Sequence, residues 1–411
     1  MTPLTTTFRF RARTLAALLA VAALAAACSG DSGGSEGSDG DGEAAPDTPA
    51  APAEVEEFAG PVDAFYEVPD PLPAGEPGDL IRTMPIEAPA GEVGLRVMYH
   101  STDATGDDRA VTGTMYYPTA EPPEGGWPVV AWAHGTSGLA ASCAPSRAPA
   151  PPPAFGVEGV RVATDYLGLG PVGELHPYLS AAAEGNAVID GVAAARAMPE
   201  AGAGDQWVVA GVSQGGHAVL VTNEMAADRL PDAELLGAVA IAPGSQLGES
   251  YGDDLQIRVI TTLVLFGVAA DDPEVDPREY LSPDVYDAAA GAIEDGCMGD
   301  VMSDLVPLAA SPDYFTTDPR TAQVGEAWVE ENDPGQVASD TPLLLVQGGQ
   351  DPVVVPARTA ALYDRLCEVG QVVHEVDIPP ASHDTITDLA GDDITAWLAA
   401  RFAGDPAPDD C

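Results

Sequence analysis

A serine flanked by glycines occupies the centre of Gly211-Val212-Ser213-Gln214-Gly215. The apolar run 207–210 precedes it and a stretch rich in Ala, Val and Leu follows, which predicts a buried strand, a tight turn and a helix. Such a turn exposes the serine hydroxyl, and the glycines let strand and helix approach without a side-chain clash. We predict that Ser213 is a nucleophile. The same five-residue pattern also occurs in purely structural turns, so the prediction depends on partner residues elsewhere.

A nucleophilic serine needs a base, and the base needs a carboxylate that orients it. His383 lies in Pro380-Ala381-Ser382-His383-Asp384, just after the last predicted strand, and is the predicted base. Asp351 follows the buried run 343–347 through a glycine turn and is the predicted acid. All three residues stand at the carboxyl ends of predicted strands, where open α/β sheets bind ligands. Their chain order is nucleophile, acid, base.

The rival bases and acids fit this geometry less well. His217 lies one helical turn beyond Ser213 and is interpreted as a packing residue. Asp377 lies within a strand and Asp340 before one, whereas Asp384 is too close to His383 in sequence to orient its ring. We interpret His134 as a loop-shaping residue. The sequence suggests no partner for the remaining histidines, His100, His176 and His374.

A candidate oxyanion site precedes these residues. The loop His134-Gly135-Thr136-Ser137-Gly138 directly follows the apolar strand 128–133. Backbone N–H groups at such a position can stabilise the negative charge that develops on a carbonyl oxygen. We predict that Thr136 supplies one N–H group and that Gln214, the residue after the nucleophile, supplies the other; the Thr136 hydroxyl is a further candidate donor.

The elements that position these residues alternate along the chain, which predicts a mainly parallel sheet covered by helices on both faces. The segments 95–99 and 111–117 indicate an antiparallel pair of strands at its start. Further strands are predicted at 128–133, 159–164, 207–212, 236–242, 343–347 and 372–378, and helices at 181–198, 217–230, 357–369 and 385–402.

The alternation breaks at about 245–341, before the strand that precedes the acid. An insertion of this length indicates a lid or cap subdomain and not a loop. It contains two amphipathic segments, 255–270 and 285–293. The apolar part 257–266 either lines a pocket for an acyl chain or forms the core of the cap, and the sequence favours neither.

The charge of the chain restricts its partners. The 411 residues carry 65 acidic and 16 basic side chains, and every basic one is Arg. A surface with a net charge of −49 repels nucleic acid and anionic headgroups, so we predict no nucleic-acid partner. No C-x-x-C pair indicates zinc, and the Asp-Gly repeat at 39–42 lacks the spacing of a calcium loop. The sequence predicts neither a metal nor an organic cofactor.

The N-terminus has the pattern of an export signal over residues 1–27. Arg9, Arg11 and Arg13 precede the apolar run 15–27, which is too short to span a membrane comfortably. Small residues before Cys28 resemble a bacterial lipobox, which predicts lipid attachment at Cys28 and tethering to a membrane; the alternative is ordinary cleavage after Ala-x-Ala. Residues 28–79 are expected to form a linker and lead-in, with the catalytic domain at 80–411.

Four further cysteines remain, namely Cys143, Cys297, Cys367 and Cys411. An even number in an exported protein suggests two disulfides. Four cysteines allow three disulfide pairings, and their number and spacing alone do not choose among them.

The region from about 80 to 411 resembles the α/β-hydrolases, and more narrowly the secretory lipases typified by fungal lipase A and their actinobacterial relatives. The resemblance is carried by the motifs at 164–170, 176–179 and 186–190, beside the elbow and the insertion before the acid. It implies hydrolysis of small-molecule or lipid esters through Ser213, Asp351 and His383, with a lid over the acyl site. It also implies the pairs Cys143–Cys297 and Cys367–Cys411.

Two motifs of this sequence depart from the pattern of the secretory lipases. The elbow Ser-Gln-Gly-Gly-His and the His-Gly-Thr loop are closer to those of bacterial esterases and prolyl peptidases. An exported serine peptidase of the same fold and a non-catalytic surface lipoprotein are therefore the alternatives.

Overall fold

The structure is a computed structural model, and it describes residues 54–171, 173–249, 255–319 and 326–411. The predicted signal peptide at 1–27, Cys28 and most of the predicted linker lie outside the described residues. Within the described ranges, none of the helices combines the length and the apolar character that crossing a bilayer requires.

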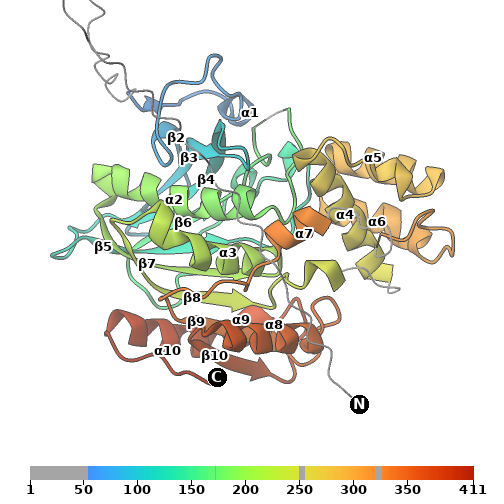
Figure 1. Cartoon of the computed structure of the whole chain (residues 1–411). Coiled ribbons are helices and arrows are strands. Elements are labelled where there is room, and N and C mark those ends of the chain that lie inside the picture. Colours follow the sequence, from blue (N-terminus) through green and yellow to red (C-terminus); the bar gives the residue numbers. More distant parts are fainter. Residues whose placement is uncertain (1–53, 172, 250–254, 320–325) are drawn as a thin grey trace, which may run out of the picture. The chain divides into compact units, whose positions relative to one another are not determined.

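One ten-stranded sheet organises the chain, in the order β1-β2-β3-β4-β6-β5-β7-β8-β9-β10 (Figure 1). The strands β2, β3, β4 and β6 pair antiparallel, and every other neighbouring pair is parallel. Their bounds are β1 Glu56–Glu57, β2 Leu80–Ile86, β3 Glu92–Thr102, β4 Asp108–Pro118, β5 Trp127–Ala133, β6 Val160–Thr164, β7 Ala203–Val212, β8 Glu234–Ile241, β9 Leu343–Gly348 and β10 Val373–Ile378.

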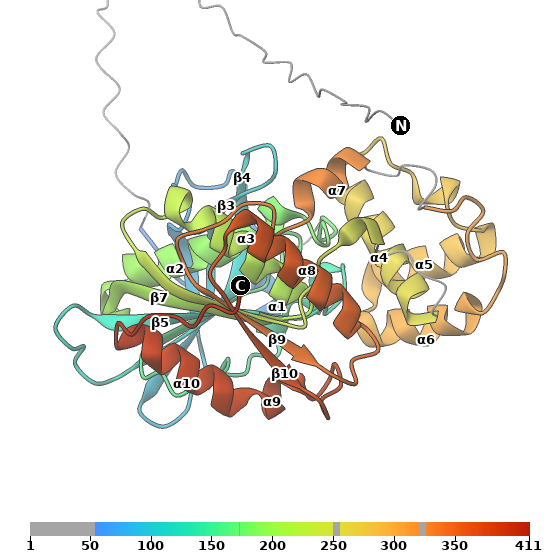
Figure 2. The ribbon, with the colours of Figure 1, turned by 60° about the horizontal axis from the view of Figure 1, so that its bottom comes forward.

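Helices cover both faces of this sheet (Figure 2). The helices α2 (Ala187–Ala197), α3 (Gln214–Arg229) and α8 (Pro356–Val369) pack on one face, where Val129 and Val209 join their core. The helices α9 (Ile386–Leu389) and α10 (Gly391–Phe402) pack on the other, with Val130 and Val208. Adjacent residues of one strand thus enter opposite cores, which explains the continuous apolar runs in the sequence. The predicted, mainly parallel sheet with helices on both faces is confirmed.

In the described part of the segment between β8 and β9, four α-helices form a cap with a core of its own. They are α4 (Leu255–Asp271), α5 (Pro283–Asp295), α6 (Met298–Ala309) and α7 (Glu326–Asn332). Leu263, Leu265, Ile293 and Leu305 are among the buried side chains of this second core. Figure 1 shows the cap beside the carboxyl-terminal ends of the parallel strands.

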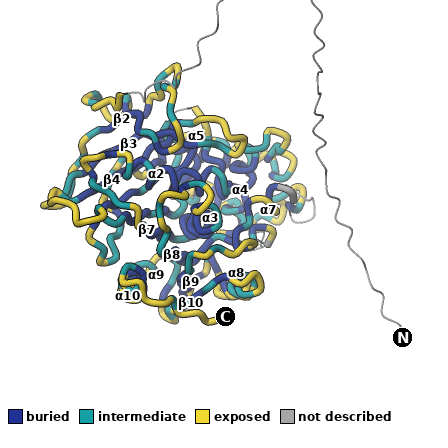
Figure 3. The backbone as a smooth tube through the Cα atoms, turned by 60° about the vertical axis from the view of Figure 1, so that its left-hand side comes forward, coloured by how far each residue is buried: buried dark blue, intermediate teal, exposed yellow. Residues whose placement is uncertain are grey.

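The structure differs from the sequence prediction in the lead-in and in the last helix, among other places. Residues 54–79, assigned to the linker and lead-in, contain β1 and α1 (Val62–Phe65) and bury Phe65 and Tyr66 completely. These two aromatic residues pack with Met98 of β3 in a small core of their own. The predicted last helix is two helices, α9 and α10, which meet at Ala390 (φ −90°, ψ 0°). Figure 3 shows buried residues running through the sheet and exposed ones gathering on its connecting loops.

Candidate active site

Ser213 sits on a sharp turn between β7 and α3. Its backbone has φ 60° and ψ −116°, a conformation that costs a non-glycine residue energy and is found at functional sites. The end of β8 and the loop after it hold the turn, since Ser213 N donates to Ile241 O at 2.9 Å and Gly244 N donates to Ser213 O at 2.9 Å. A Cβ atom on Gly215 would lie 1.9 Å from Ala133 O, so only glycine allows helix and strand to approach this closely.

His383 and Asp351 are joined by a hydrogen bond of 2.7 Å from His383 Nδ1 to Asp351 Oδ2. The other carboxylate oxygen of Asp351 accepts hydrogen bonds from the N–H groups of Val353 (2.8 Å) and Val354 (2.9 Å), in the turn after β9. Asp351 is 4% exposed, so its orientation is fixed by buried contacts. With the ring proton on Nδ1, Nε2 is the basic nitrogen of a neutral His383.

Ser213 and His383 line one cavity of about 570 Å³ between the sheet and the cap. The loop after β5 contributes Gly135 and Thr136, so the candidate oxyanion loop faces the same space. The cap side is lined by Gln256 and Ile260 of α4 and by Met298 and Met302 of α6. Of the apolar segment 257–266, Ile260 therefore reaches this cavity, whereas Val259, Leu263 and Leu265 lie in the core of the cap.

The loop that carries Thr136 is held by contacts that sequence inspection does not reveal. The Thr136 hydroxyl forms a hydrogen bond of 2.8 Å with the hydroxyl of the buried Tyr178. One residue further on, Ser137 O accepts a hydrogen bond of 2.8 Å from Met298 N at the start of α6. Gln214 is the first residue of α3 and is buried, so its N–H belongs to the free donors at a helix N-terminus.

Two disulfides frame the site. Cys143 is bonded to Cys297, which joins the region after the Thr136 loop to the start of α6 in the cap. Cys367 near the end of α8 is bonded to Cys411. These are the two pairs that the family resemblance implies.

The rival histidines all have partners of their own. The ring nitrogens of His217 contact Glu184 (2.6 Å) and the carbonyl of Asn332 (2.8 Å). The three histidines without a predicted partner each have one: His100 contacts Asp108, His176 contacts Gln214 and His374 contacts Asp410. His134 Nδ1 lies 2.7 Å from Gly135 O within its own loop.

Glu184 is a buried polar residue that no sequence pattern marks as part of the site. It lies in the segment 181–198, which is predicted only as a helix. It is fully buried and contacts both Gln214 and His217. A lone carboxylate within the run Ala181-Ala182-Ala183-Glu184-Gly185 was the available signal.

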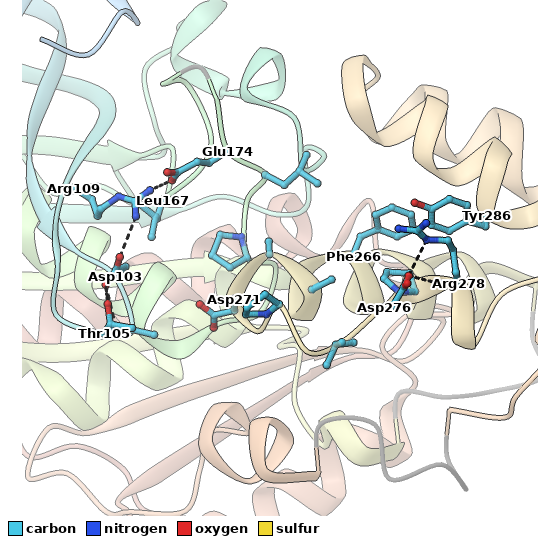
Figure 4. A pocket seen from close by; sticks show the side chains of 18 residues that line it. Asp103, Thr105, Arg109, Leu167, Glu174, Phe266, Asp271, Asp276, Arg278 and Tyr286 are labelled. Atoms are coloured by element: carbon cyan, nitrogen blue, oxygen red, sulfur yellow. Dashed lines mark hydrogen bonds and ion pairs between the residues drawn. The ribbon is translucent and has the colours of Figure 1, made fainter. Parts of the chain in front are cut away.

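A second cavity of about 670 Å³ lies between the sheet and the cap but does not include Ser213 (Figure 4). At one end Arg109 is paired with Asp103 (3.1 Å) and with Glu174. At the other end Arg278 is paired with Asp276 (3.0 Å) and lies over the Tyr286 ring, whose other neighbour is Phe266. Within the described ranges, no group of three or more His, Cys, Asp or Glu side chains could hold a metal ion.

The fold, with a serine elbow facing a cap, defines the class of the α/β-hydrolases. The model of the secretory lipase family matches residues 157–410, and the chain belongs to this family. It is accordingly a carboxylic ester hydrolase.

Comparison with solved structures agrees on the fold. The rice cell wall degrading esterase LipA from Xanthomonas oryzae superposes with a TM-score of 0.65 at 17% identity, over 81% of this chain and 100% of that one. Lipase A of Candida antarctica in its closed state gives a TM-score of 0.66 at 16% identity, over 85% of this chain and 88% of that one. Comparison with curated protein sequences gives no match.

Proposed function

We propose that the protein hydrolyses carboxylic esters through a triad of Ser213, His383 and Asp351. The observation that carries the proposal is the hydrogen bond between Asp351 and His383 at the wall of the cavity that Ser213 also lines. Asp351 orients the His383 ring and stabilises its charged form, while Nε2 receives the proton of the Ser213 hydroxyl.

In the first half of the reaction, Ser213 Oγ bonds to the ester carbonyl carbon while its proton passes to His383. The electron pair of the carbonyl moves onto oxygen, and the N–H groups of Thr136 and Gln214 stabilise this oxyanion. The intermediate collapses, the bond to the alcohol oxygen breaks, and His383 gives its proton to the leaving alcohol. An acyl group then remains on Ser213.

In the second half, a water molecule attacks the acyl group in the way that Ser213 attacked the ester. His383 takes a proton from water, the hydroxyl adds to the acyl carbon, and the intermediate expels Ser213 Oγ, which takes the proton back. The products are a carboxylic acid and free enzyme.

The cap, which we place at about 245–341 within a catalytic domain of 80–411, supplies the substrate preference. Ile260, Met298 and Met302 give the wall opposite Ser213 an apolar surface. Apolar walls favour an apolar acyl chain. We therefore propose neutral esters with an aliphatic acyl group as the substrates.

The test compares the native protein with Ser213→Ala in the cleavage of p-nitrophenyl butyrate. We expect loss of at least about a thousandfold in kcat, because the covalent route is removed. A fluorophosphonate probe should label the native protein and not the variant. Unchanged thermal unfolding would show that the variant is folded, and retained ester cleavage would contradict the triad. Cleavage of aminoacyl amides in preference to esters would favour a peptidase.

We also propose that the protein is exported and anchored by lipid at Cys28. The basic and apolar pattern before Cys28 supports this, as do the two disulfides, which persist in oxidising compartments. Metabolic labelling with a tritiated fatty acid should mark the native protein and not Cys28→Ser. Equal labelling of both, or of neither, would contradict lipid attachment at this residue.

A further inference from the structure

A carboxylate lies buried directly behind the serine elbow. Glu184 is 0% exposed and belongs to the π-helical turn Ala182–Asn186 at the start of α2. Single π-helical turns are rare and frequent at functional sites. The ester hydrolysis described above assigns no role to Glu184, although its neighbour Gln214 supplies a proposed oxyanion donor.

Each oxygen of Glu184 has defined partners. Oε1 accepts hydrogen bonds from Leu179 N (3.0 Å) and from Gln214 Nε2 (2.8 Å). Oε2 accepts a hydrogen bond of 2.6 Å from His217 Nδ1. A second ring, His176, lies 3.7 Å from Oε1 through its Nε2 atom.

The partner His217 carries a positive charge. Its Nδ1 atom faces a carboxylate and its Nε2 atom faces the carbonyl oxygen of Asn332 in α7 at 2.8 Å. Both neighbours accept hydrogen bonds, so both ring nitrogens must donate, which requires the imidazolium. Burial alone would raise the pKa of Glu184 and lower that of His217. The attraction between the two charges outweighs burial, so the pKa of Glu184 is lowered and that of His217 is raised. The charged pair links the elbow helix to the cap.

The side chain of Gln214 is fixed in one orientation. His176 Nδ1 lies 2.7 Å from the carbonyl of Leu167, so it donates there and its Nε2 atom is an acceptor. Gln214 Nε2 lies 2.7 Å from that acceptor and donates its second hydrogen to Glu184. Glu184 and His176 thus hold Gln214, whose backbone N–H is a proposed oxyanion donor.

The same carboxylate oxygen also holds the other side of the proposed oxyanion site. Leu179, which donates to Oε1, has φ 61°, a left-handed conformation that is uncommon for a bulky residue and needs support. The preceding residue is Tyr178, whose hydroxyl contacts the Thr136 hydroxyl. One oxygen atom therefore connects the segment that supports Thr136 with the side chain of Gln214.

We propose that Glu184 is a positioning residue that fixes the distance between the two oxyanion donors, Thr136 and Gln214. This inference rests on the proposed function, because it takes Thr136 and Gln214 to be the oxyanion donors. It assigns no reacting atom to Glu184. A buried ion pair is often replaceable by apolar groups where only stability is required. Here the carboxylate instead joins the segments 178–179 and 214–217 directly, and His217 extends the link to the carbonyl oxygen of Asn332 in the cap.

The test uses Glu184→Gln, which keeps the shape and removes the charge. We expect kcat for p-nitrophenyl butyrate to fall about tenfold with KM changed less than about twofold, since the oxyanion donors act in the transition state. The decisive comparison uses the thiono analogue of the ester, whose sulfur accepts hydrogen bonds weakly. Its kcat should fall less than about threefold, because the oxyanion donors contribute little to it.

A matched control distinguishes positioning from general loss of structure. Glu224 lies on the same helix α3 and accepts from Gly335 N at 2.7 Å, away from the elbow. Glu224→Gln should leave the ratio of ester to thionoester rates unchanged. An unchanged kcat in Glu184→Gln, or equal losses on both substrates, would overturn the proposal. Ser213→Ala in the same assay tests the proposed function separately, because its retained activity would overturn the triad whatever Glu184 does.

A second variant covers the case in which Glu184→Gln does not fold. Gln214→Met keeps the backbone N–H and the length of the side chain but removes the hydrogen bonds to Glu184 and His176. It should lower the ester rate about tenfold and again more than the thionoester rate. Equal effects on the two substrates would overturn the proposal.

Discussion

Two of the cavities in the described part of the chain lie between the sheet and the cap, and the smaller of these two carries the proposed chemistry. The cavity at Ser213 measures about 570 Å³ and joins a serine, a histidine backed by a buried carboxylate, and two methionines. The larger one measures about 670 Å³ and is lined by arginines that carboxylates already neutralise. Cavity size is therefore a poor guide here. Groups that can exchange a proton and form a covalent bond distinguish the first from the second.

Among the substitutions that test this difference between the two cavities, Asp351→Asn should have the largest effect. The amide leaves His383 without a negative partner and favours the wrong tautomer, so kcat for p-nitrophenyl butyrate should fall by about a thousandfold or more. Asp377→Asn, on the exposed part of β10, is the matched control and should change kcat less than about twofold. A loss below about tenfold in Asp351→Asn would remove this carboxylate from the proposed triad.

A smaller effect is expected at the cap wall of the Ser213 cavity. Ile260→Trp fills space opposite the nucleophile, so kcat/KM for a p-nitrophenyl octanoate should fall about tenfold while that for the acetate stays within about twofold. Phe266→Trp makes a related change in the other cavity and should leave the chain-length profile as it is. An identical shift in both variants would mean that the two cavities act as one.

The smallest effect is expected from Arg109→Gln in the larger cavity. The guanidinium is 28% exposed and its partner Glu174 is 56% exposed, so solvent weakens the pair. The free energy of unfolding, measured in urea, should fall by at most about 1 kcal/mol, with esterase activity unchanged. A tenfold loss of activity would contradict this difference between the cavities and would make the larger cavity part of the substrate site.

The proposed triad was predictable because each of its members follows a strand of recognisable sequence. The apolar runs before Ser213 and Asp351 enter opposite cores on their two faces, and such runs are visible in the sequence without a structure. The Asp351–His383 contact then follows from the topology, since β9 and β10 are parallel neighbours. Periodicity, turn residues and chain order were sufficient information.

The cluster around Glu184 was not predictable in the same way. Glu184 contacts Leu179 and Gln214 directly and is linked to Asn332 through His217, so the cluster draws on three separate parts of the chain, and no local pattern records which of them meet. His217 was interpreted as a packing residue, and the charge on its ring follows only from the two acceptors that the fold places beside it. The same reason explains Phe65 and Tyr66, which are buried by distant strands within a segment of linker-like composition.

The two disulfides place the three residues of the proposed triad in three different segments of the unfolded chain. The bond between Cys143 and Cys297 closes a loop of 154 residues that contains Ser213, and the bond between Cys367 and Cys411 closes one of 44 residues that contains His383. Asp351 lies in the open segment between them. On the chain-entropy model, the loss of freedom in the denatured ensemble contributes about 5 and about 4 kcal/mol respectively. Refolding from the oxidised state therefore begins with two covalently closed rings, one holding the proposed nucleophile and the other holding the proposed base.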